Sequence, residues 1–521
     1  MRTGAFLKGG AALVIVAAAV FGCAALPSLP SLPPAQHAVS TAFLDTAGTR
    51  LGMAVAPLAQ AHPALSGIYP LAEGRDAFAA RALLAHRAER SLDLQYYIWR
   101  NDLTGMLMLD TLLSAAARGV RVRLLLDDNN TAGLDPTLLA LDRDPNIEVR
   151  LFNPFATREW RSLGYLTDFA RLNRRMHNKS FTVDNQVTIV GGRNIGDAYF
   201  GAADDVLFAD LDVMAIGPAV QAVSQDFDRY WNNPSAYPVT ALVDAGAVAA
   251  APALAERAAA LRRTPAAQAY LQALGTLPFV EQLTQRRLPL EWGQARLVSD
   301  DPDKVRGVGR AQAWVGARLR ALLGEPQRQL DLVSPYFVPG KETAATLASI
   351  ASHGAAVRVL TNSLEATDVA AVHAGYVKWR RELLRAGVTL YELRREGSEQ
   401  KQRRRDGGFG SSGASLHAKT FAVDRRRIFV GSFNLDPRSL DLNTEMGLVI
   451  DSPALASALD ARLSEAMPGR AYEVRLGPGD KLVWIEQTGQ GAIEHEQEPG
   501  AGFWKRTGVR ILSWLPIDWL L

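Results

Sequence analysis

The pattern of apolar and polar positions repeats in the same order in the two halves of the chain. Residues 91–99 and 120–127 predict two strands that are separated by a helical stretch. The second half repeats this order, with strands predicted over 330–337 and 357–362 and a helix predicted over 343–353. Strands that alternate with helices predict an α/β fold with a central, largely parallel or mixed sheet.

An eight-residue motif occurs once in each half. It has the sequence His-Asn-Lys-Ser-Phe-Thr-Val-Asp at 177–184 and His-Ala-Lys-Thr-Phe-Ala-Val-Asp at 417–424, which is a shift of 240 residues. In each copy, a turn of small residues follows six residues after the last Asp and ends in an asparagine, Asn194 or Asn434. This duplication predicts tandem domains of one fold that build a single active site from two halves.

Length and charge limit the class of protein. With 521 residues, 48% of them hydrophobic and 21% charged, the chain is globular and too long for one core, which agrees with two domains. The 57 basic and 54 acidic residues give a net charge of +3. This balance is too even to indicate a nucleic-acid-binding protein.

The N-terminus resembles a bacterial lipoprotein signal. Arg2 and Lys8 precede a short apolar stretch at 11–22, and Val-Phe-Gly-Cys at 20–23 resembles a lipoprotein cleavage site. Cys23 is the only cysteine, so an intramolecular disulfide is excluded. We predict a mature protein that starts at a lipidated Cys23; an uncleaved anchor or an ordinary secretory signal is the alternative. In each case the body lies outside the cytoplasm beside a membrane.

The motif residues suit the chemistry of a phosphate. His177 and Lys179 are two residues apart on an extended segment and therefore face the same side, as do His417 and Lys419. Two pairs of an imidazole and an ammonium fit an anion, and the lysines would neutralise the nonbridging oxygens of a phosphate. Further hydrogen-bond donors to this phosphate are predicted at Asn194, Asn434 and Ser432.

Acidic residues after the motifs are candidates to orient the histidines. One imidazole can attack phosphorus while the other protonates the departing alcohol, provided that an acceptor fixes each tautomer. Alignment of the strands that follow the motifs places Asp210 opposite Glu445. We predict that Asp210 orients His177 and that Glu445 orients His417, with Asp212 as a competitor of Asp210.

The last residues of the two motifs, Asp184 and Asp424, are part of the catalytic constellation. We expect them to fix the turn through backbone hydrogen bonds and not to touch the phosphate. The chain has eight histidines, no His-x-x-x-His helix and a lone cysteine, so the sequence predicts no metal site and no cofactor.

The two His-x-Lys-x-x-x-x-Asp motifs and their Gly-Gly and Gly-Ser turns resemble those of the phospholipase D superfamily, over 92–450. The resemblance implies metal-free, ping-pong phosphodiester exchange through a phosphohistidine. It also implies a site at the interface of two pseudo-two-fold-related domains. His177 would be the nucleophile and His417 the general acid and then base; the assignment between the two histidines is left open.

Within the superfamily, residues 95–102, 175–179, 191–200 and 208–212 are similar to bacterial cardiolipin synthases, especially the type called cardiolipin synthase C. This similarity implies a phosphatidyltransferase that moves a phosphatidyl group from one phospholipid to the head-group alcohol of phosphatidylglycerol. Phosphatidylethanolamine is a second candidate substrate. No pair of transmembrane helices precedes the catalytic body, unlike in other synthase branches.

Residues 503–515 interleave aromatic, aliphatic and basic side chains, which predicts contact with the head-group boundary of a membrane. A tail that folds over the protein core is the alternative. The polar and basic stretch 394–413 before the second motif is predicted to be a solvated loop, and contact with anionic head groups is the alternative.

Together these features predict an α/β protein with two tandem phospholipase D-like domains, each a mixed β-sheet flanked by helices. The predicted segments are a signal peptide at 1–22, a lipidated cysteine and Pro-rich linker at 23–40, the first domain at 41–235, a helical connector at 236–295, the second domain at 296–475, and a C-terminal extension with the membrane segment at 476–521.

Other functions fit the same motifs. Water can take the phosphohistidine, which would make the protein a phospholipid hydrolase. A phosphodiesterase on nucleic acid would need a basic stripe with stacking aromatics. A silent lipid-binding scaffold would be expected to have lost a histidine or lysine, and this chain has lost none. We expect phospholipids and a membrane surface as partners, no nucleic acid, and leave open an accessory protein and the oligomeric state.

Overall fold

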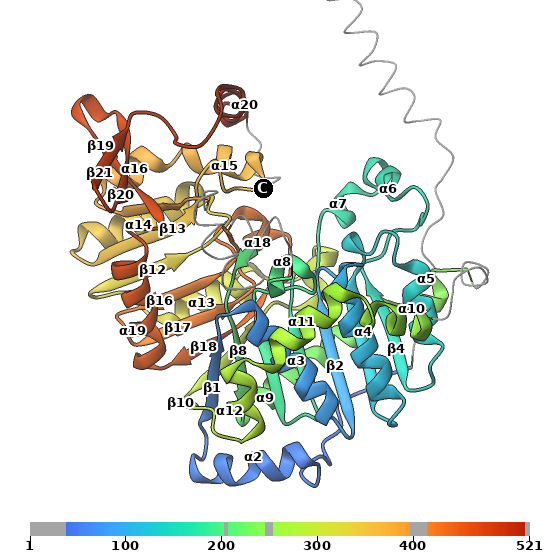
Figure 1. Cartoon of the computed structure of the whole chain (residues 1–521). Coiled ribbons are helices and arrows are strands. Elements are labelled where there is room, and N and C mark those ends of the chain that lie inside the picture. Colours follow the sequence, from blue (N-terminus) through green and yellow to red (C-terminus); the bar gives the residue numbers. More distant parts are fainter. Residues whose placement is uncertain (1–37, 203–206, 245–253, 396–413, 516–521) are drawn as a thin grey trace, which may run out of the picture.

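The computed structural model describes residues 38–202, 207–244, 254–395 and 414–515. Two α/β lobes lie side by side, and each is built on one mixed sheet (Figure 1). The predicted signal peptide, Cys23 and residues 396–413 lie outside the described residues. The predicted fold class is confirmed.

The N-terminal sheet has the strand order β10-β1-β8-β6-β5-β2-β3-β4-β9 among the described residues. Strands β2, β3 and β4 are parallel, and the remaining neighbours pair antiparallel. The strands are β1 (Ser66–Leu71), β2 (Ser91–Tyr96), β3 (Arg121–Asp127), β4 (Ile147–Phe152), β5 (Ser180–Val183), β6 (Val187–Gly191), β8 (Asp212–Ile216), β9 (Ala236–Pro238) and β10 (Glu291–Gly293).

The C-terminal sheet repeats this plan in the order β11-β18-β17-β16-β12-β13-β14-β19-β20-β21. Strands β12, β13 and β14 are parallel, and β16 pairs antiparallel with β12, as β5 does with β2. The strands are β11 (Ala295–Ser299), β12 (Gln329–Val333), β13 (Ala356–Asn362), β14 (Thr389–Leu393), β16 (Thr420–Val423), β17 (Arg427–Gly431), β18 (Met446–Asp451), β19 (Ala471–Leu476), β20 (Leu482–Thr488) and β21 (Gly491–His495).

Helices cover both sheets, as expected for strands that are apolar on both faces. In the described part of the predicted connector, three helices pack on the N-terminal lobe, while β9 and β10 extend the edges of its sheet. The helices are α2 (Arg50–Ala61), α3 (Gly74–Arg87), α4 (Leu103–Ala116), α5 (Asp135–Asp142), α6 (Arg161–Thr167), α7 (Phe169–Leu172), α8 (Asp197–Phe200), α9 (Pro218–Trp231), α10 (Leu254–Arg262), α11 (Pro265–Gly275), α12 (Pro278–Thr284), α13 (Val315–Leu323), α14 (Gly340–Ser352), α15 (Ala370–Val377), α16 (Arg380–Arg385), α18 (Pro437–Asp441), α19 (Pro453–Ala461) and α20 (Phe503–Ser513).

The two lobes share an apolar core. Side chains of β1, β6, β8 and α9 pack against side chains of β16, β17 and β18 in one buried cluster. Val190 and Val213 from the first lobe and Val430 and Leu448 from the second belong to it. Because this cluster contains the strands that follow both motifs, it fixes the two motifs relative to each other.

Short backbone pairings cross between the lobes next to this core. β7 (Leu207–Ala209) pairs in parallel with β15 (Ala414–Leu416), and Met176 forms an isolated parallel bridge with Thr444.

No helix in the described ranges has the length and apolar character needed to span a bilayer.

Candidate active site

Each motif histidine is held in place by the backbone of the other lobe. The N–H of His177 donates to the carbonyl of Thr444 over 2.9 Å, and the N–H of His417 donates to the carbonyl of Ala209, also over 2.9 Å. His177 and His417 lie just before β5 and β16, so both are at the end of the sheet where the parallel strands finish. The duplicated motifs therefore meet at one interface.

The acidic partners of the histidines are exchanged between the lobes. Nδ1 of His177 lies 2.8 Å from a carboxylate oxygen of Glu445, and Nδ1 of His417 lies 2.6 Å from a carboxylate oxygen of Asp210. The prediction that Asp210 orients His177 and Glu445 orients His417 is wrong. The alignment of the two halves correctly placed Asp210 and Glu445 at equivalent positions. Each acid, however, directly follows a short segment that pairs with the backbone of the other lobe just before its histidine, so each carboxylate reaches the histidine of the other half.

Asp212, the competitor of Asp210, has a different task. Its carboxylate forms a buried ion pair with Arg81 at 2.8 Å and accepts a hydrogen bond from the backbone N–H of Arg193 at 3.1 Å. Asp212 therefore ties β8 to α3 and to the turn after β6.

Both motif lysines are buried beside their histidines. Nζ of Lys179 donates to the carbonyl of His177 over 2.5 Å. Nζ of Lys419 donates to the carbonyl of His417 and lies 3.0 Å from its Nδ1. Burial lowers the pKa of Lys179, and the positive charge of Lys419 lowers it further, while Glu445 opposes the shift. Two ammonium groups that repel each other inside the protein form a site that an anion would stabilise.

Two tyrosines form walls next to the imidazoles. The ring of Tyr97 meets the ring of His177 edge-on at 4.9 Å, and the ring of Tyr199 meets that of His417 edge-on at 5.2 Å. Nζ of Lys179 lies 5.3 Å from the centre of the Tyr97 ring. Sequence reasoning assigned these tyrosines no role, although both lie in the segments that carry the resemblance.

Polar residues at the ends of β3 and β13 hold the segments that lead into the motifs. Asp127 accepts a hydrogen bond from the N–H of Met176 at 2.8 Å, and the side chain of Asn362 bonds both the N–H and the carbonyl of Leu416 at 2.9 and 3.0 Å. Sequence reasoning missed these two residues. The available signal was that both predicted strands, 120–127 and 357–362, end in a short polar side chain.

Comparison with known proteins identifies the family. The model described as "Cardiolipin synthase, PLD-like domain" matches residues 83–231 and 319–467. The chain belongs to the phospholipase D superfamily. It is a cardiolipin synthase-like enzyme of that superfamily.

Relatives with this architecture cover most of the chain. Cardiolipin synthase C of Escherichia coli (strain K12) is 50% identical over 473 residues, which is 91% of this chain and 100% of that protein. A cardiolipin synthase of Alkalihalophilus pseudofirmus is 26% identical and covers 72% of this chain and 61% of its own length. The crystal structure of phosphatidylserine synthase of Haemophilus influenzae Rd KW20 matches the fold with a TM-score of 0.56 at 14% identity, over 90% of this chain and 100% of that one.

The two His–carboxylate pairs of this superfamily member differ in charge. Burial raises the pKa of Asp210, but the charges of His417 and Lys419 outweigh burial and hold that pKa well below its usual range. Burial raises the pKa of Glu445 to about 7, against the opposing charge of Lys179. Asp210 therefore keeps its negative charge beside His417, whereas the carboxylate of Glu445 beside His177 takes up a proton more easily than that of Asp210.

Residue types after the motifs explain part of this difference. A Cβ on Gly192 would lie 2.2 Å from a carboxylate oxygen of Asp210, so the close approach of this acid requires glycine. The equivalent position in the second half is Ser432, whose hydroxyl donates to Glu445 over 2.5 Å, and Ser439 donates to the other oxygen over 2.9 Å. Ser432 was expected to bind phosphate, but its proton is used to hold Glu445.

The predicted asparagines are buried next to the histidine segments. Asn194 accepts a hydrogen bond from the N–H of Ile98 at 3.1 Å and donates to the hydroxyl of Tyr199 at 3.1 Å. The backbone N–H of Asn434 donates to Ser439 at 3.3 Å, and the side-chain oxygen of Asn434 is buried. Asn194 thus positions the tyrosine beside His417, and its role as a phosphate ligand stays a prediction, as does that of Asn434.

The last Asp of each motif ties the backbone together away from the histidines. Asp184 accepts hydrogen bonds from the N–H groups of residues 89–91, and Asp424 accepts them from those of residues 327–329, at 2.8 to 3.2 Å. Both adopt positive φ values, 49° and 54°. They anchor the start of β2 and β12, as the turn-fixing role expected of them requires.

Within the described ranges, no three His, Cys, Asp or Glu side chains are grouped so that they could hold a metal ion.

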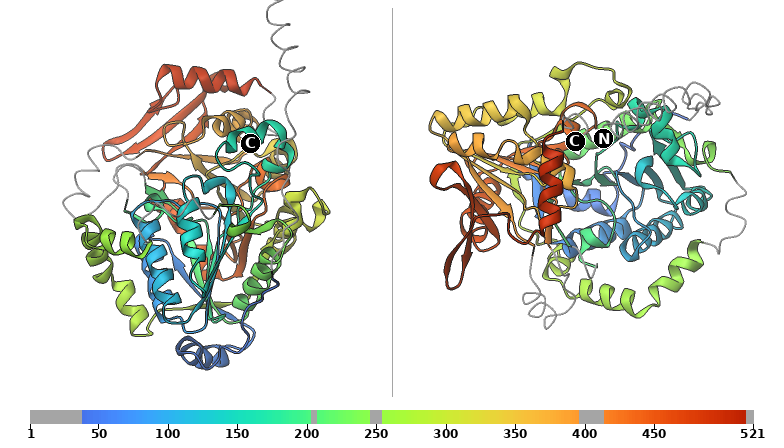
Figure 2. Two further views of the ribbon diagram at one scale, coloured as in Figure 1. Left: turned by 90° about the vertical axis from the view of Figure 1, so that its right-hand side faces the viewer. Right: turned by 90° about the horizontal axis from the view of Figure 1, so that it is seen from above.

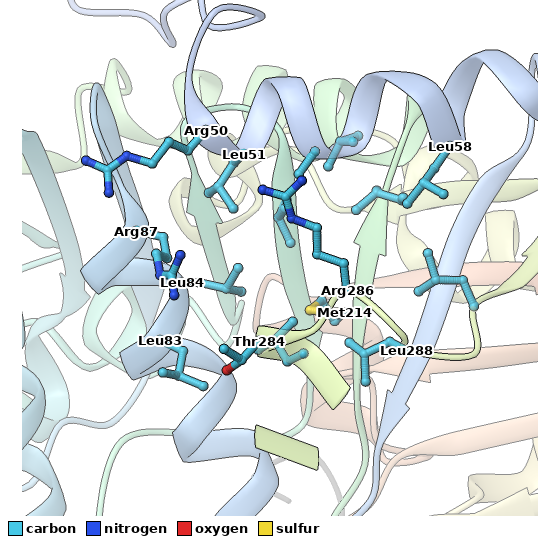
Figure 3. A pocket seen from close by; sticks show the side chains of 16 residues that line it. Arg50, Leu51, Leu58, Leu83, Leu84, Arg87, Met214, Thr284, Arg286 and Leu288 are labelled. Atoms are coloured by element: carbon cyan, nitrogen blue, oxygen red, sulfur yellow. The ribbon is translucent and has the colours of Figure 1, made fainter. Parts of the chain in front are cut away.

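An apolar cavity of about 180 Å³ lies under α2, between α3 and the segment that follows α12 (Figure 3). None of the motif residues lines this cavity, so it is separate from the histidine site.

Proposed function

We propose that the protein is a phosphatidyltransferase that makes cardiolipin, or a related phospholipid, through a phosphohistidine intermediate. The observation that carries this proposal is the pair of buried imidazoles, His177 and His417, whose Nδ1 atoms face carboxylates of the opposite lobes beside two buried lysines. The name of the relative at 50% identity, cardiolipin synthase C, supports phospholipids as the substrate class.

In the first half-reaction, Nε2 of His177 attacks the phosphorus of the donor lipid. An N–P bond forms and the bond between phosphorus and the head-group oxygen breaks. His417 gives its Nε2 proton to the departing alkoxide, which leaves as an alcohol. The ammonium groups of Lys179 and Lys419 leave the carbonyls of His177 and His417 and contact the nonbridging oxygens of the phosphate. This contact lowers the free energy of the negative charge in the buried site.

In the second half-reaction, the free alcohol of phosphatidylglycerol attacks the same phosphorus. His417, now neutral, takes the proton of this hydroxyl, the new P–O bond forms, and the N–P bond to His177 breaks. The enzyme returns to its starting protonation state, with one phosphodiester exchanged for another. Phosphatidylethanolamine serves as an alternative phosphatidyl donor.

The charge difference between the two pairs supports this division of roles. Burial lowers the pKa of His417 to about 4, but the charge of Asp210 opposes this shift and so favours the protonated ring that a general acid needs. Burial and the charges of both lysines lower the pKa of His177 well below its ordinary value, which keeps the ring neutral. In the charged form, Glu445 accepts the remaining proton at Nδ1, so that Nε2 has the free lone pair that a nucleophile needs.

We also propose that the enzyme is a lipoprotein of the bacterial envelope. Lipidation at Cys23 would anchor the chain in the bacterial envelope, with the catalytic body on the periplasmic or extracytoplasmic side. An accessory protein is compatible with this arrangement.

A lipid product assay tests the function. The purified protein is incubated with labelled phosphatidylglycerol, with and without phosphatidylethanolamine or an added alcohol, and the products are resolved by mass spectrometry. Cardiolipin, and a new phospholipid whenever an alcohol is added, are the expected products. Phosphatidic acid as the sole product, in an amount that no acceptor changes, would identify a hydrolase and refute the proposal.

A further inference from the structure

Helix α20 exposes an apolar stripe although it is firmly packed. Val509 and Leu512 on its inner side pack against Ala374 of α15. On its outer side, Trp504 and Ile511, seven residues apart, are 82% and 53% exposed. Phe503, Trp514 and Leu515 are exposed as well. The outer stripe is therefore a surface that the fold of the described residues does not bury.

The polar residues of α20 have a single charge sign. Its sequence contains Lys505, Arg506 and Arg510 and no acidic residue. Lys505 and Arg510 are exposed. Aromatic and aliphatic side chains that alternate with basic ones suit the boundary between anionic head groups and acyl chains.

A second apolar projection lies on the other lobe, at α6 and α7. Leu166 is 75% exposed and Trp160, the residue before α6, is 65% exposed. Leu163 and Phe169 add a further exposed surface to this projection. Four large apolar side chains within ten residues would be costly to leave in water unless a partner covers them.

Polar contacts on the underside hold this projection in place. Arg158 pairs with Asp128 at 2.5 Å and Arg161 pairs with Asp135 at 2.8 Å. The hydroxyl of Tyr165 in α6 donates to a side-chain oxygen on the loop after β3 over 2.6 Å. The apolar side chains therefore point outward from a fixed support.

Both projections adjoin the histidine site. Asn129 accepts from Tyr165 and donates to the hydroxyl of Tyr97 over 3.4 Å, and Tyr97 contacts His177. On the other lobe, the charge of Asp368 acts on Lys419 and on Tyr199, and Asp368 lies two residues before α15, on which α20 packs. Two views show α6, α7 and α20 at the same end of the molecule (Figures 1 and 2).

We propose that these two projections form one docking face that seats the catalytic end of the enzyme on a phospholipid bilayer. The docking face comprises Trp160, Leu163, Leu166 and Phe169 from α6 and α7, and Trp504, Ile511 and Trp514 from the C-terminal segment. With both lobes in contact with the bilayer, the head groups lie over His177 and His417, whose side chains are 10% and 11% exposed. This inference rests on the proposed function, because a lipid substrate requires the site to face the lipid.

An anionic bilayer fits this face better than a second protein. The two apolar patches belong to separate lobes at the same end of the molecule, and the charge on α20 is only positive. A protein seated across both patches would cover the histidine site and keep the substrate out. A bilayer can contact both patches and still deliver the substrate.

Site-specific labelling tests the docking face directly. In the full chain with Cys23→Ser, single cysteines carrying an environment-sensitive dye are placed at Leu166, Trp504 or Met53. Met53 is 60% exposed on α2, at the opposite end of the molecule, and is the matched control. Vesicles of phosphatidylglycerol and phosphatidylethanolamine should raise the emission at 166 and 504 about twofold with a blue shift and leave that at 53 unchanged. A response at only one projection, an equal response at 53, or no response would overturn the proposal.

Activity on two physical forms of substrate provides a second test. The double variant Leu166→Glu/Trp504→Glu should reduce turnover of vesicle phosphatidylglycerol about tenfold, because carboxylates are costly at the apolar boundary. Turnover of a soluble short-chain phosphatidylglycerol should stay within about twofold, since both changes are on the surface. Met53→Glu should leave both activities unchanged. Unchanged vesicle turnover in the double variant would refute the docking face. If the unmodified enzyme forms no transfer product from either substrate, the proposed function fails, and the dye experiment still decides whether the face binds lipid.

Discussion

Replacing Asp210 with Asn tests the exchanged pairing of the two lobes. The carboxylate of Asp210 lies 2.6 Å from Nδ1 of His417, and both groups are buried. A hydrogen bond to a buried charged group contributes about 1.5–3 kcal/mol. If that energy is needed to hold the proton on His417 in the transition state, loss of the charge slows transfer about 10- to 150-fold, because 1.36 kcal/mol corresponds to a factor of ten.

The pH profile gives the sign of the same effect. Burial lowers the pKa of His417 to about 4, and the charge of Asp210 opposes that shift. Without this charge, the pKa of His417 falls further. A general acid is lost as the pH rises through its pKa, so the limb on which activity declines with rising pH should move to lower pH in Asp210→Asn. Glu445→Gln should leave this limb in place, because Glu445 contacts His177.

Nitrogen-15 NMR of histidine-labelled protein reads out the pairing independently of activity. Asp210→Asn should shift the Nδ1 resonance of His417 and leave that of His177 nearly unchanged, and Glu445→Gln should do the reverse. If Asp210→Asn perturbs only His177, the exchanged arrangement is refuted, whatever happens to the rate. Circular dichroism of each variant confirms that the fold is retained.

Three further outcomes follow from the structure. Gly192→Ala should lower the initial rate of transfer at least tenfold, because the new Cβ would lie 2.2 Å from an oxygen of Asp210. Gly489→Ala is the control and should leave the rate unchanged, because no atom lies within 4 Å of that position. Ala54→Leu should fill part of the apolar cavity under α2 and raise the free energy of unfolding by about 1 kcal/mol in urea titrations; a lower value would show that the cavity cannot accept the side chain. Burial raises the pKa of Glu498, but Arg380 and a histidine outweigh burial and lower this pKa to about 2. The stability that Glu498 contributes is therefore complete above its unfolded pKa of 4.5 and is lost as the pH falls toward 2. Glu498→Gln should remove about 3 kcal/mol of this stability, and an unchanged acid limb in pH-dependent unfolding would contradict the role of Glu498.

The sequence predicted the fold and the identity of the central residues because both depend on repetition. Strand periodicity and the duplicated motif were enough to find two mixed-sheet lobes with His177 and His417 at their interface. The alignment of the halves also matched Asp210 with Glu445. It could not show which histidine each acid contacts, because an alignment compares positions within a half and the crossing of β7 to β15 is a long-range pairing.

Side-chain roles were harder to predict where one residue serves another. Ser432 was predicted to donate to the phosphate together with Asn194 and Asn434, yet its hydroxyl donates to Glu445. Asp127 and Asn362 end ordinary strands, and only the fold brings them beside the segments that lead into the motifs. Their function depends on distances that sequence spacing does not encode.

The exchange of carboxylates makes the two lobes mutually dependent. His177 takes both its backbone anchor and its acidic partner from the second lobe, at Thr444 and Glu445, and His417 takes its own from Ala209 and Asp210 of the first. A separated lobe would keep its histidine and lysine but lose the group that fixes the tautomer of that histidine. The shared apolar core between the sheets then has a catalytic consequence, because it holds both His–carboxylate contacts, which cross between the lobes, in register. Activity in this architecture should therefore be more sensitive to substitutions in the interlobe core than the stability of either lobe alone.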